Sequence, residues 1–210
     1  IKMIQNSIWN EKYRVTELGK FVCNDNTRAD LEKYISNEDI PHLLLAGRAG
    51  VGKTTLAKLL YTNIDCDFLF LNASDENGID VIREKVKNFA QSASFKKIKI
   101  IVLDEADYLT KEAQAALRNI IEVYSKTTRF ILTCNYLEKI IEPLQSRCNV
   151  YKLEPPSKGV VAERLVDILE NEKINYKLED VVKIVNGTYP DVRRAINLTQ
   201  QYSLNGELKS

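Results

Sequence analysis

Histidine, methionine and tryptophan are nearly absent from this 210-residue sequence, which contains one of each. Zinc sites are built from clustered cysteines and histidines, so the lone His42 and the lack of any Cys-X-X-Cys pair argue against one. We expect His42 to be a packed residue beside a strand. The four cysteines are far apart, and each lies in or beside an apolar run: Cys23, Cys66, Cys134 and Cys148. Such cysteines are typical of reduced, buried thiols in an intracellular protein.

Long hydrophobic runs and an excess of one charge are also missing. No stretch approaches the roughly 18 apolar residues that a membrane-spanning helix needs, and no signal peptide is recognisable, so we expect no membrane association. The 30 Lys and Arg residues nearly balance the 29 Asp and Glu residues, which leaves a net charge of +1. A polyanion would therefore have to bind a local basic patch. An apolar fraction of 44% supports a core, in one large domain or in a medium and a small one.

The segment 47–54 reads Gly-Arg-Ala-Gly-Val-Gly-Lys-Thr and matches the phosphate-binding pattern G-x-x-x-x-G-K-[ST] at every fixed position. An apolar run over 41–46 predicts a strand before it, and apolar spacing over 55–62 predicts a helix after it. Successive backbone N–H groups of such a loop point at a phosphate near the helix N-terminus. Lys53 is predicted to reach the outer phosphates and Thr54 to bind Mg²⁺. The alternative is a glycine-rich turn with a chance lysine, which leaves the flanking strand and helix unexplained.

A second motif follows about fifty residues later. Residues 99–103 form a β-branched apolar run, typical of a parallel strand buried on both faces, and the run ends in Asp104 and Glu105. Because α/β sheets bind ligands at the carboxyl ends of their strands, Asp104 is predicted to hold Mg²⁺, directly or through water. Glu105 is predicted to orient and polarise the attacking water. The alternative is an ordinary acidic turn after a strand.

Strands alternate with helices up to residue 155. The predicted strands cover 41–46, 67–71, 99–103, 128–133 and 149–153, and the predicted helices cover 27–36, 55–62, 79–93 and 110–124. This order indicates an α/β fold, in which a parallel sheet has helices on both faces. Two consecutive prolines then end the pattern, and the remaining segments predict helices over 157–171, 178–186 and 191–202. We therefore predict an α/β nucleotide-binding domain over 1–155 and a small helical domain over 156–210.

Six short runs occur in an order that resembles one family: 9–14 (WNEKYR), the phosphate loop, 71–80 (LNASDENGID), 103–107 (LDEAD), 133–135 (TCN) and 146–148 (SRC). They are similar to the small subunits of replication factor C, the clamp loaders of archaea and eukaryotes, with relatives in T4-like phages. The resemblance extends from about residue 8 to residue 202. It implies an AAA+ module, a P-loop parallel sheet flanked by helices, followed by an all-helical lid.

The resemblance also implies roles for residues outside the loop. Tyr13 and Arg14 would lie against the adenine and the phosphates, and Asn135 would sense the γ-phosphate. Arg147 would be an arginine finger that enters the neighbouring subunit's site, whereas Arg193 would contact the γ-phosphate of its own subunit. The resulting ATP-binding set, with the finger left out, is Tyr13, Arg14, Gly47, Gly50, Val51, Gly52, Lys53, Thr54, Thr55 and Arg193. The alternatives are a strand cap for Asn135 and solvated surface arginines for the other two.

By this resemblance the chain is an ATPase subunit that uses ATP and Mg²⁺ to open a sliding clamp and load it onto primed DNA. Its expected partners are other clamp-loader subunits, as a pentamer, together with the clamp and the DNA. A basic track could contact DNA phosphates, the alternative being solvated lysines and arginines: Arg83, Lys87, Lys96 and Lys97. The expected location is intracellular: the nucleus in a eukaryote, and the cytoplasm or nucleoid in an archaeon or phage host. Two other functions remain open, a scaffold subunit that binds ATP without hydrolysing it and a helicase-type motor.

The sequence departs from the family pattern at several positions. Val15 replaces the usual proline after Tyr-Arg, Arg48 and Ala49 occupy loop positions that commonly hold proline, and Asn77 replaces a basic residue. Asn72 resembles the polar residue that orients Glu105 in response to DNA. Family members also carry a third, helical collar domain. The sequence ends at Ser210, near where a collar would begin, so a collar is not expected within these residues; a longer natural protein and a reduced version are the two explanations.

Overall fold

The computed structural model describes residues 8–203 and 206–209, which form two compact units. One unit contains the sheet and comprises 17–48 and 52–153. The other contains the C-terminal helices and comprises 8–16, 49–51 and the described residues from 154 onward. The division after residue 153 lies close to the expected boundary near 155. The N-terminal residues, which were expected in the nucleotide-binding domain, group instead with the helical unit.

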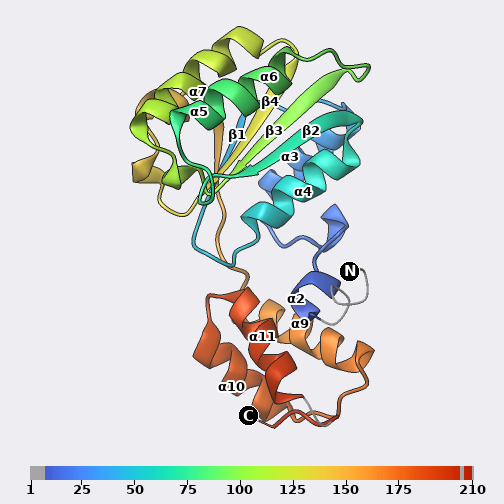
Figure 1. The fold of residues 1–210 in the computed structure, drawn as a ribbon. Helices are drawn as coiled ribbons and strands as arrows, with labels where there is room; N and C mark the ends of the chain where they lie inside the picture. Colours follow the sequence, from blue (N-terminus) through green and yellow to red (C-terminus); the bar gives the residue numbers. More distant parts are fainter. Residues whose placement is uncertain (1–7, 204–205, 210) are drawn as a thin grey trace. The chain divides into compact units, whose positions relative to one another are not determined.

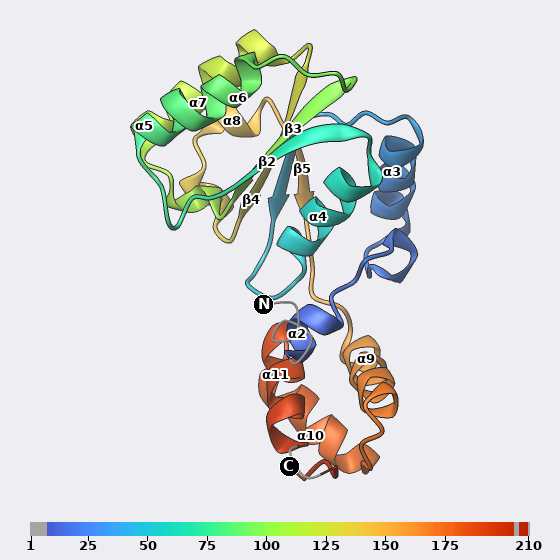
Figure 2. The same cartoon turned by 45° about the vertical axis from the view of Figure 1, so that its right-hand side comes forward.

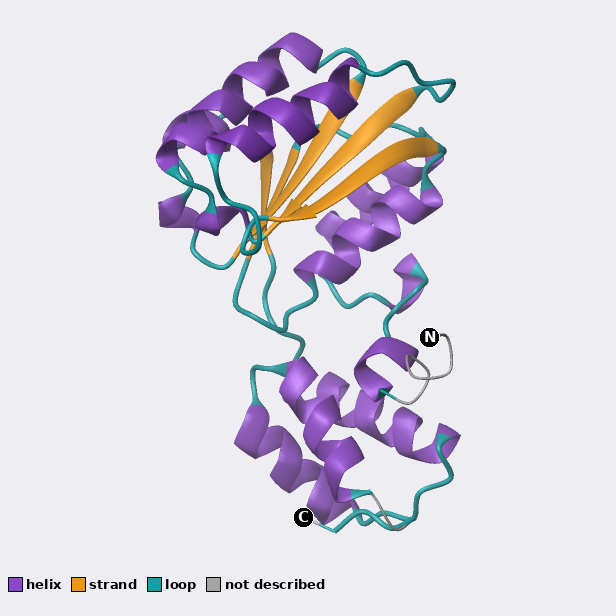
Figure 3. Ribbon diagram, viewed as in Figure 1, coloured by secondary structure: helices purple, strands orange, loops and turns teal. Residues whose placement is uncertain are grey.

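The sheet has five parallel strands in the order β2-β3-β4-β1-β5. Figure 1 labels β1 to β4, and Figure 3 draws the strands in orange. The strands are β1 (Leu43–Ala46), β2 (Cys66–Asn72), β3 (Ile98–Asp104), β4 (Thr128–Cys134) and β5 (Asn149–Lys152). Every predicted strand is present, with bounds that differ by one or two residues. β1 and β3 are fully buried, as expected of central strands covered on both faces. The doubly covered parallel sheet predicted from the sequence is therefore confirmed.

Helices cover both faces of this sheet (Figures 1 and 2). One face carries α5 (Ile79–Val81), the π-helical turn η2 (Ile82–Val86), α6 (Lys87–Gln91), α7 (Lys111–Tyr124) and α8 (Glu142–Gln145). The other face carries α3 (Asp25–Ser36) and α4 (Lys53–Asn63). The helix predicted over 79–93 is thus continuous but ends at Gln91 and contains a π-helical turn. Short 3₁₀ turns, which were not predicted, are η1 (Leu18–Lys20), η3 (Ala106–Tyr108) and η4 (Leu137–Lys139).

Local sequence explains where the helices begin. Asn24 caps α3 because its side chain accepts a hydrogen bond from the Thr27 amide, and Thr110 caps α7 in the same way through the Ala113 amide. α7 is amphipathic, with Ala113 and Leu117 fully buried in the core between this helix and the sheet. α7 therefore has a fixed position over the sheet.

The helical unit contains α9 (Lys158–Asn171), α10 (Leu178–Thr188) and α11 (Val192–Tyr202), close to the three predicted helices. The short helix α2 (Trp9–Lys12) packs into the same core, where Trp9 is 7% exposed. Hydrogen bonds fix α2 there: the Trp9 amide donates to Gln200 Oε1 over 3.0 Å, and Asn10 Nδ2 donates to the Arg193 carbonyl over 3.1 Å. Burial of a tryptophan explains why this segment groups with helices more than 150 residues away in sequence. Among the described residues, no helix is both long and apolar enough to cross a membrane.

Candidate nucleotide-binding site

The predicted phosphate loop joins β1 to α4 at the carboxyl edge of the sheet. Gly50 and Gly52 have φ values of +81° and +98°, which favour glycine because a Cβ atom is strained there. A Cβ at Gly52 would also lie 3.0 Å from Cε2 of the buried Phe21. The loop begins next to β4, since the Gly47 amide donates to the Cys134 carbonyl over 3.2 Å. Both glycines are therefore needed for the conformation of the loop itself, in addition to any close approach of a phosphate.

Lys53, the first residue of α4, is 7% exposed and turns its ammonium group back into the loop. Its Nζ atom donates to the carbonyls of Gly47 (2.8 Å) and Arg48 (2.9 Å) and to Asn135 Oδ1 (2.8 Å). Burial lowers the pKa of Lys53, and the negative charge of Asp104 opposes that shift. Lys53 and Asn135, 82 residues apart in sequence, are thus brought together as predicted for a γ-phosphate site.

Asn135 follows β4 and is half-buried. Because its carbonyl oxygen faces Lys53, its amide Nδ2 is the end of the side chain that can donate to an anion. This orientation suits a phosphate sensor, although the sensing role itself remains a prediction. Val51, in the loop, is buried. Thr55, in the first turn of α4, is half-buried, so neither side chain is fully exposed.

The two residues predicted to hold Mg²⁺ are in direct contact. The Thr54 hydroxyl lies 2.9 Å from each carboxylate oxygen of Asp104, and Asp104 is 8% exposed at the end of β3. A hydroxyl beside a carboxylate supplies the oxygen ligands that Mg²⁺ prefers. The residues present therefore fit a magnesium ion, and the assignment remains a prediction.

Thr133, which was not predicted to be a site residue, connects Asp104 to Glu105. Its hydroxyl donates to Asp104 Oδ1 over 2.7 Å and accepts from the Glu105 amide over 3.0 Å, and the residue is fully buried in β4. Glu105 itself has φ 57° and ψ 42°, a left-handed conformation that is uncommon outside glycine, asparagine and aspartate. Strained backbone of this kind needs support from its surroundings, and Thr133 provides it. Thr133 belongs to the run 133–135 (TCN) noted in the sequence, but only Asn135 of that run was given a role.

Asp107 is a further buried carboxylate near the loop. It is 7% exposed, and its Oδ2 accepts from the Tyr136 amide over 3.3 Å. Within the described part of the chain, its Oδ1 has no hydrogen-bond partner. Its charge contributes to raising the pKa of the buried Cys134 thiol to about 12, although burial is the larger cause. Cys134 is therefore a protonated structural thiol. All four cysteines are free thiols, but only Cys134 and Cys148 are buried, whereas Cys23 and Cys66 are half-buried, so the expectation of buried thiols is correct for two of the four.

Three predicted nucleotide contacts, Tyr13, Arg14 and Arg193, lie in the helical unit. The Tyr13 hydroxyl donates to Glu172 Oε1 over 2.6 Å, and burial together with this bond raises the pKa of Tyr13. Arg14 Nη2 lies 2.5 Å from Glu11 Oε1. Arg193 is exposed at the start of α11. Their contacts with adenine or phosphate remain predictions.

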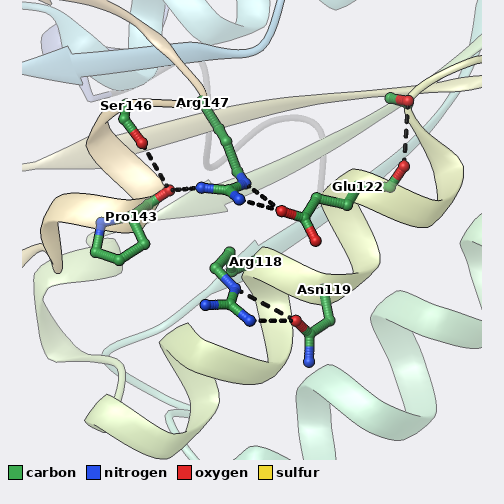
Figure 4. Close-up of polar contacts among 7 residues, drawn as sticks. Arg118, Asn119, Glu122, Pro143, Ser146 and Arg147 are labelled. Atoms are coloured by element: carbon green, nitrogen blue, oxygen red, sulfur yellow. Dashed lines mark hydrogen bonds and ion pairs between the residues drawn. The ribbon is translucent and has the colours of Figure 1, made fainter.

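Arg147 lies at the opposite edge of the sheet from the phosphate loop. It precedes β5, whose first residue pairs with the first residue of β1, so Arg147 is at the amino ends of the parallel strands. Figure 4 shows its guanidinium between α7 and α8. There Nε donates to Glu122 Oε1 over 2.9 Å, Nη1 donates to the Pro143 carbonyl over 2.7 Å, and Nη2 also donates to Glu122. The structure thus separates Arg147 from the Lys53 site of its own chain.

Two of the four residues in the predicted basic track, Lys96 and Lys97, contact other parts of the chain. Lys96 forms an ion pair with Asp65 at 2.5 Å, and Lys97 donates to the Asn37 carbonyl over 3.3 Å. Arg83 and Lys87 are exposed on the helix formed by η2 and α6. Contact of these residues with DNA remains a prediction.

Comparison with known proteins places this geometry in a family. Residues 43–155 match the model of the ATPase family associated with various cellular activities (AAA). The chain is 44% identical to the replication factor C small subunits of Sulfolobus acidocaldarius, over 98% of the chain and 66% of that protein, and of Archaeoglobus fulgidus, over 96% and 65%. It therefore spans about two thirds of the length of these relatives, and the resemblance noted in the sequence is confirmed.

A solved structure shows the same fold at low sequence identity. The RuvB Holliday junction branch migration motor of Thermotoga maritima matches with a TM-score of 0.75 and 18% identity, over 90% of this chain and 64% of that one. At such identity the match supports the fold alone. The predicted P-loop fold with C-terminal helices is thereby confirmed.

Proposed function

The chain belongs to the AAA family of ATPases, and from this premise we propose that it is an ATP-hydrolysing clamp-loader subunit that opens a sliding clamp and loads it onto primed DNA. The observation that carries the proposal is the convergence of Lys53, Thr54 and Asp104 at the carboxyl edge of the sheet. The 44% identity to replication factor C small subunits supports the proposal that ATP hydrolysis acts on a sliding clamp. Within this proposal, the sheet unit is the nucleotide-binding domain that was predicted over 1–155, and the helical unit is the lid that was predicted over 156–210, with residues 8–16 grouping with the lid.

The phosphate loop would bind the phosphates of ATP through its amides and Lys53. Lys53 now donates all three of its protons to oxygen acceptors, so a phosphate would replace acceptors that already satisfy the ammonium group. Thr54 and Asp104 would hold Mg²⁺, which neutralises charge on the phosphates during transfer. Thr55, in the first turn of α4, would lie next to the phosphates. Tyr13, Arg14 and Arg193 would contact the nucleotide from the helical unit.

Glu105 would orient the attacking water. Its carboxylate follows Asp104 directly, and Thr133 fixes its backbone amide, so its side chain leaves β3 from a defined point. Asn135 would contact the γ-phosphate while bonded to Lys53. This complete set of groups favours hydrolysis over the alternative of a scaffold that only binds ATP.

Arg147 would act on the ATP of a neighbouring subunit. β1 has four residues, so its first and last Cα atoms, at the amino and carboxyl edges of the sheet, are about 10 Å apart. An arginine at the amino edge is therefore far from Lys53 of its own chain. This supports an assembly of clamp-loader subunits, in the family a pentamer, in which each interface combines one phosphate loop with one finger.

The experiment mixes two variants in the complex formed with the partner subunits, clamp and primed DNA. Glu105→Gln removes hydrolysis from its own site but leaves Arg147 intact, whereas Arg147→Ala leaves its own site intact. We expect turnover in the mixture in proportion to the interfaces that combine an intact Glu105 with an intact neighbouring Arg147. The Arg147→Ala complex alone should lose roughly 10³–10⁵ of the stimulated rate while each site keeps its ATP affinity.

A cis role for Arg147 makes the opposite prediction. Arg147→Ala would then weaken ATP binding in its own subunit, and mixing would restore nothing. A helicase-type motor would instead couple its ATP turnover to strand separation and not respond to a clamp. Measuring both couplings on the same complex separates the two functions.

A further inference from the structure

The contacts around Arg147 identify a residue that the proposed mechanism does not yet include. Glu122 lies in the last turn of α7, 25 positions before Arg147 in sequence, and its Oε1 accepts hydrogen bonds from both Nε and Nη2 of the guanidinium. Pro143, in α8, supplies a backbone carbonyl to Nη1 over 2.7 Å. The guanidinium is therefore held between α7 and α8 (Figure 4).

The geometry of these bonds leaves one edge of the guanidinium available. An arginine has five N–H groups. Glu122 and the Pro143 carbonyl accept from three of them, one each on Nε, Nη1 and Nη2. The two that remain are one on each terminal nitrogen. Within the described part of the chain, no acceptor is found for them. Two N–H groups on adjacent nitrogens form the fork with which arginine binds phosphate oxygens.

The charge around Arg147 also suits an incoming anion. Arg147 lines an open hollow of about 610 Å³ together with Lys97 and Arg129, whereas Asp39 is the acidic residue of its lining. Burial lowers the pKa of His42, another lining residue, to about 4, so His42 adds no charge at neutral pH. Arg129 is paired with Asp39 at 2.9 Å and Arg147 with Glu122, so the excess positive charge of the lining is that of Lys97.

We propose that Glu122 is a positioning residue that aims the Arg147 guanidinium at the nucleotide phosphate of the neighbouring subunit. This rests on the proposed function, because it assumes that Arg147 acts across an interface. The pair is exposed, with 31% of the Arg147 side chain and 47% of the Glu122 side chain accessible, so it contributes little to stability. Its effect is on orientation: the carboxylate occupies the Nε edge and directs the terminal edge outward. The hydrogen bond from Arg147 lowers the pKa of Glu122, which stays ionised at neutral pH.

The test is Glu122→Ala in the complete complex with partner subunits, clamp and primed DNA. Misplacing a catalytic group by about 1 Å costs up to 10²-fold, so we expect a 10- to 100-fold loss of stimulated kcat. The KM for ATP and the ATP affinity of the variant's own site should not change, since Glu122 acts through Arg147 on the neighbour's reacting phosphate. Glu122→Gln keeps an oxygen acceptor and should restore part of the rate. The control is Glu112→Ala, which removes an exposed carboxylate from the first turn of the same helix.

A double variant distinguishes positioning from a structural effect. In the Arg147→Ala background, Glu122→Ala should cause no further loss, because the residue that it aims is gone. An equal additional loss, or an unchanged rate in the single variant, would refute the positioning role. A faster rate would also refute it and would mean that Glu122 restrains the finger. If Arg147→Ala itself leaves turnover intact, the proposed function fails and not only this inference. Should Glu122→Ala fail to assemble, the Glu122→Gln kcat, measured in both backgrounds, decides the question.

Discussion

Two threonines of β4 offer a matched test of the hydrogen bonds that support the candidate site. Thr133 and Thr128 are both fully buried in the same strand. The Thr133 hydroxyl bonds both Asp104 and the Glu105 amide, whereas the Thr128 hydroxyl has no hydrogen-bond partner within the described residues. Thr133→Val and Thr128→Val make the same nearly isosteric change, so packing losses are similar and the hydrogen bonds account for the difference.

The expected magnitudes follow from these contacts. Thr133→Val removes a bond to a charged carboxylate and leaves the Glu105 amide without its acceptor, so it should lower the free energy of unfolding by about 2–4 kcal/mol. Thr128→Val removes a buried hydroxyl that gains nothing from a partner, so it should be neutral or stabilise by about 1 kcal/mol. The two variants should therefore differ by about 2–5 kcal/mol in the free energy of unfolding.

The assay must report on the sheet unit. Trp9, the single tryptophan, is buried in the helical unit, so its fluorescence reports the unfolding of that unit and not of the sheet unit. Urea unfolding followed by far-UV circular dichroism gives the midpoint, and hydrogen exchange of the Glu105 amide gives the local effect. Thr133→Val should accelerate that exchange and slow ATP turnover, and Thr128→Val should do neither. Equal unfolding midpoints for the two variants would refute the reasoning.

Two further predictions concern single residues of the sheet unit. Lys53→Ala should weaken ATP binding at least 10-fold by calorimetry, because a charge-assisted partner of the phosphates is lost; Lys111→Ala, an exposed lysine at the start of α7, is the control, and equal affinities would contradict the phosphate-loop assignment. His42, whose pKa burial lowers from 6.5 to about 4, favours the folded state only when neutral, so its contribution is complete above pH 6.5 and is lost as pH falls toward 4. His42→Asn, which can still accept from the Phe130 amide, should reduce the difference in unfolding free energy between pH 7 and pH 4.5, and an unchanged difference would exclude His42 as its source.

The fold could be predicted because its signals are local. Continuous β-branched runs identified the buried strands, and a glycine pattern between a strand and a helix identified the loop. Helix periodicity located α7 and the last three helices within two residues at either end. The position of Trp9 was not predictable in the same way. Its four-residue helix has no periodicity of its own, and its packing partners in α9 to α11 lie more than 150 residues away.

The candidate site was predicted in part for the same reason. Lys53, Thr54 and Asp104 belong to motifs in which a backbone conformation requires particular residues, so pattern and geometry coincide. Thr133 belongs to the run 133–135, but that run does not reveal its role, because a threonine in a strand is common and its contacts depend on the register between β3 and β4. That register sets Leu103 beside Leu132, and the hydroxyl of the next residue on β4 therefore reaches Asp104.

Arg147 and Glu122 show how far sequence reasoning extends at the opposite edge of the sheet. A resemblance can assign a role to an arginine, but it does not say which way the guanidinium points. That direction depends on a carboxylate supplied by α7 and a carbonyl supplied by α8, two helices brought together by packing on the sheet. Because two edges of the guanidinium are already occupied, the remaining edge fixes the direction from which an anion can approach. Residues of this chain alone thus restrict how an anion can reach Arg147.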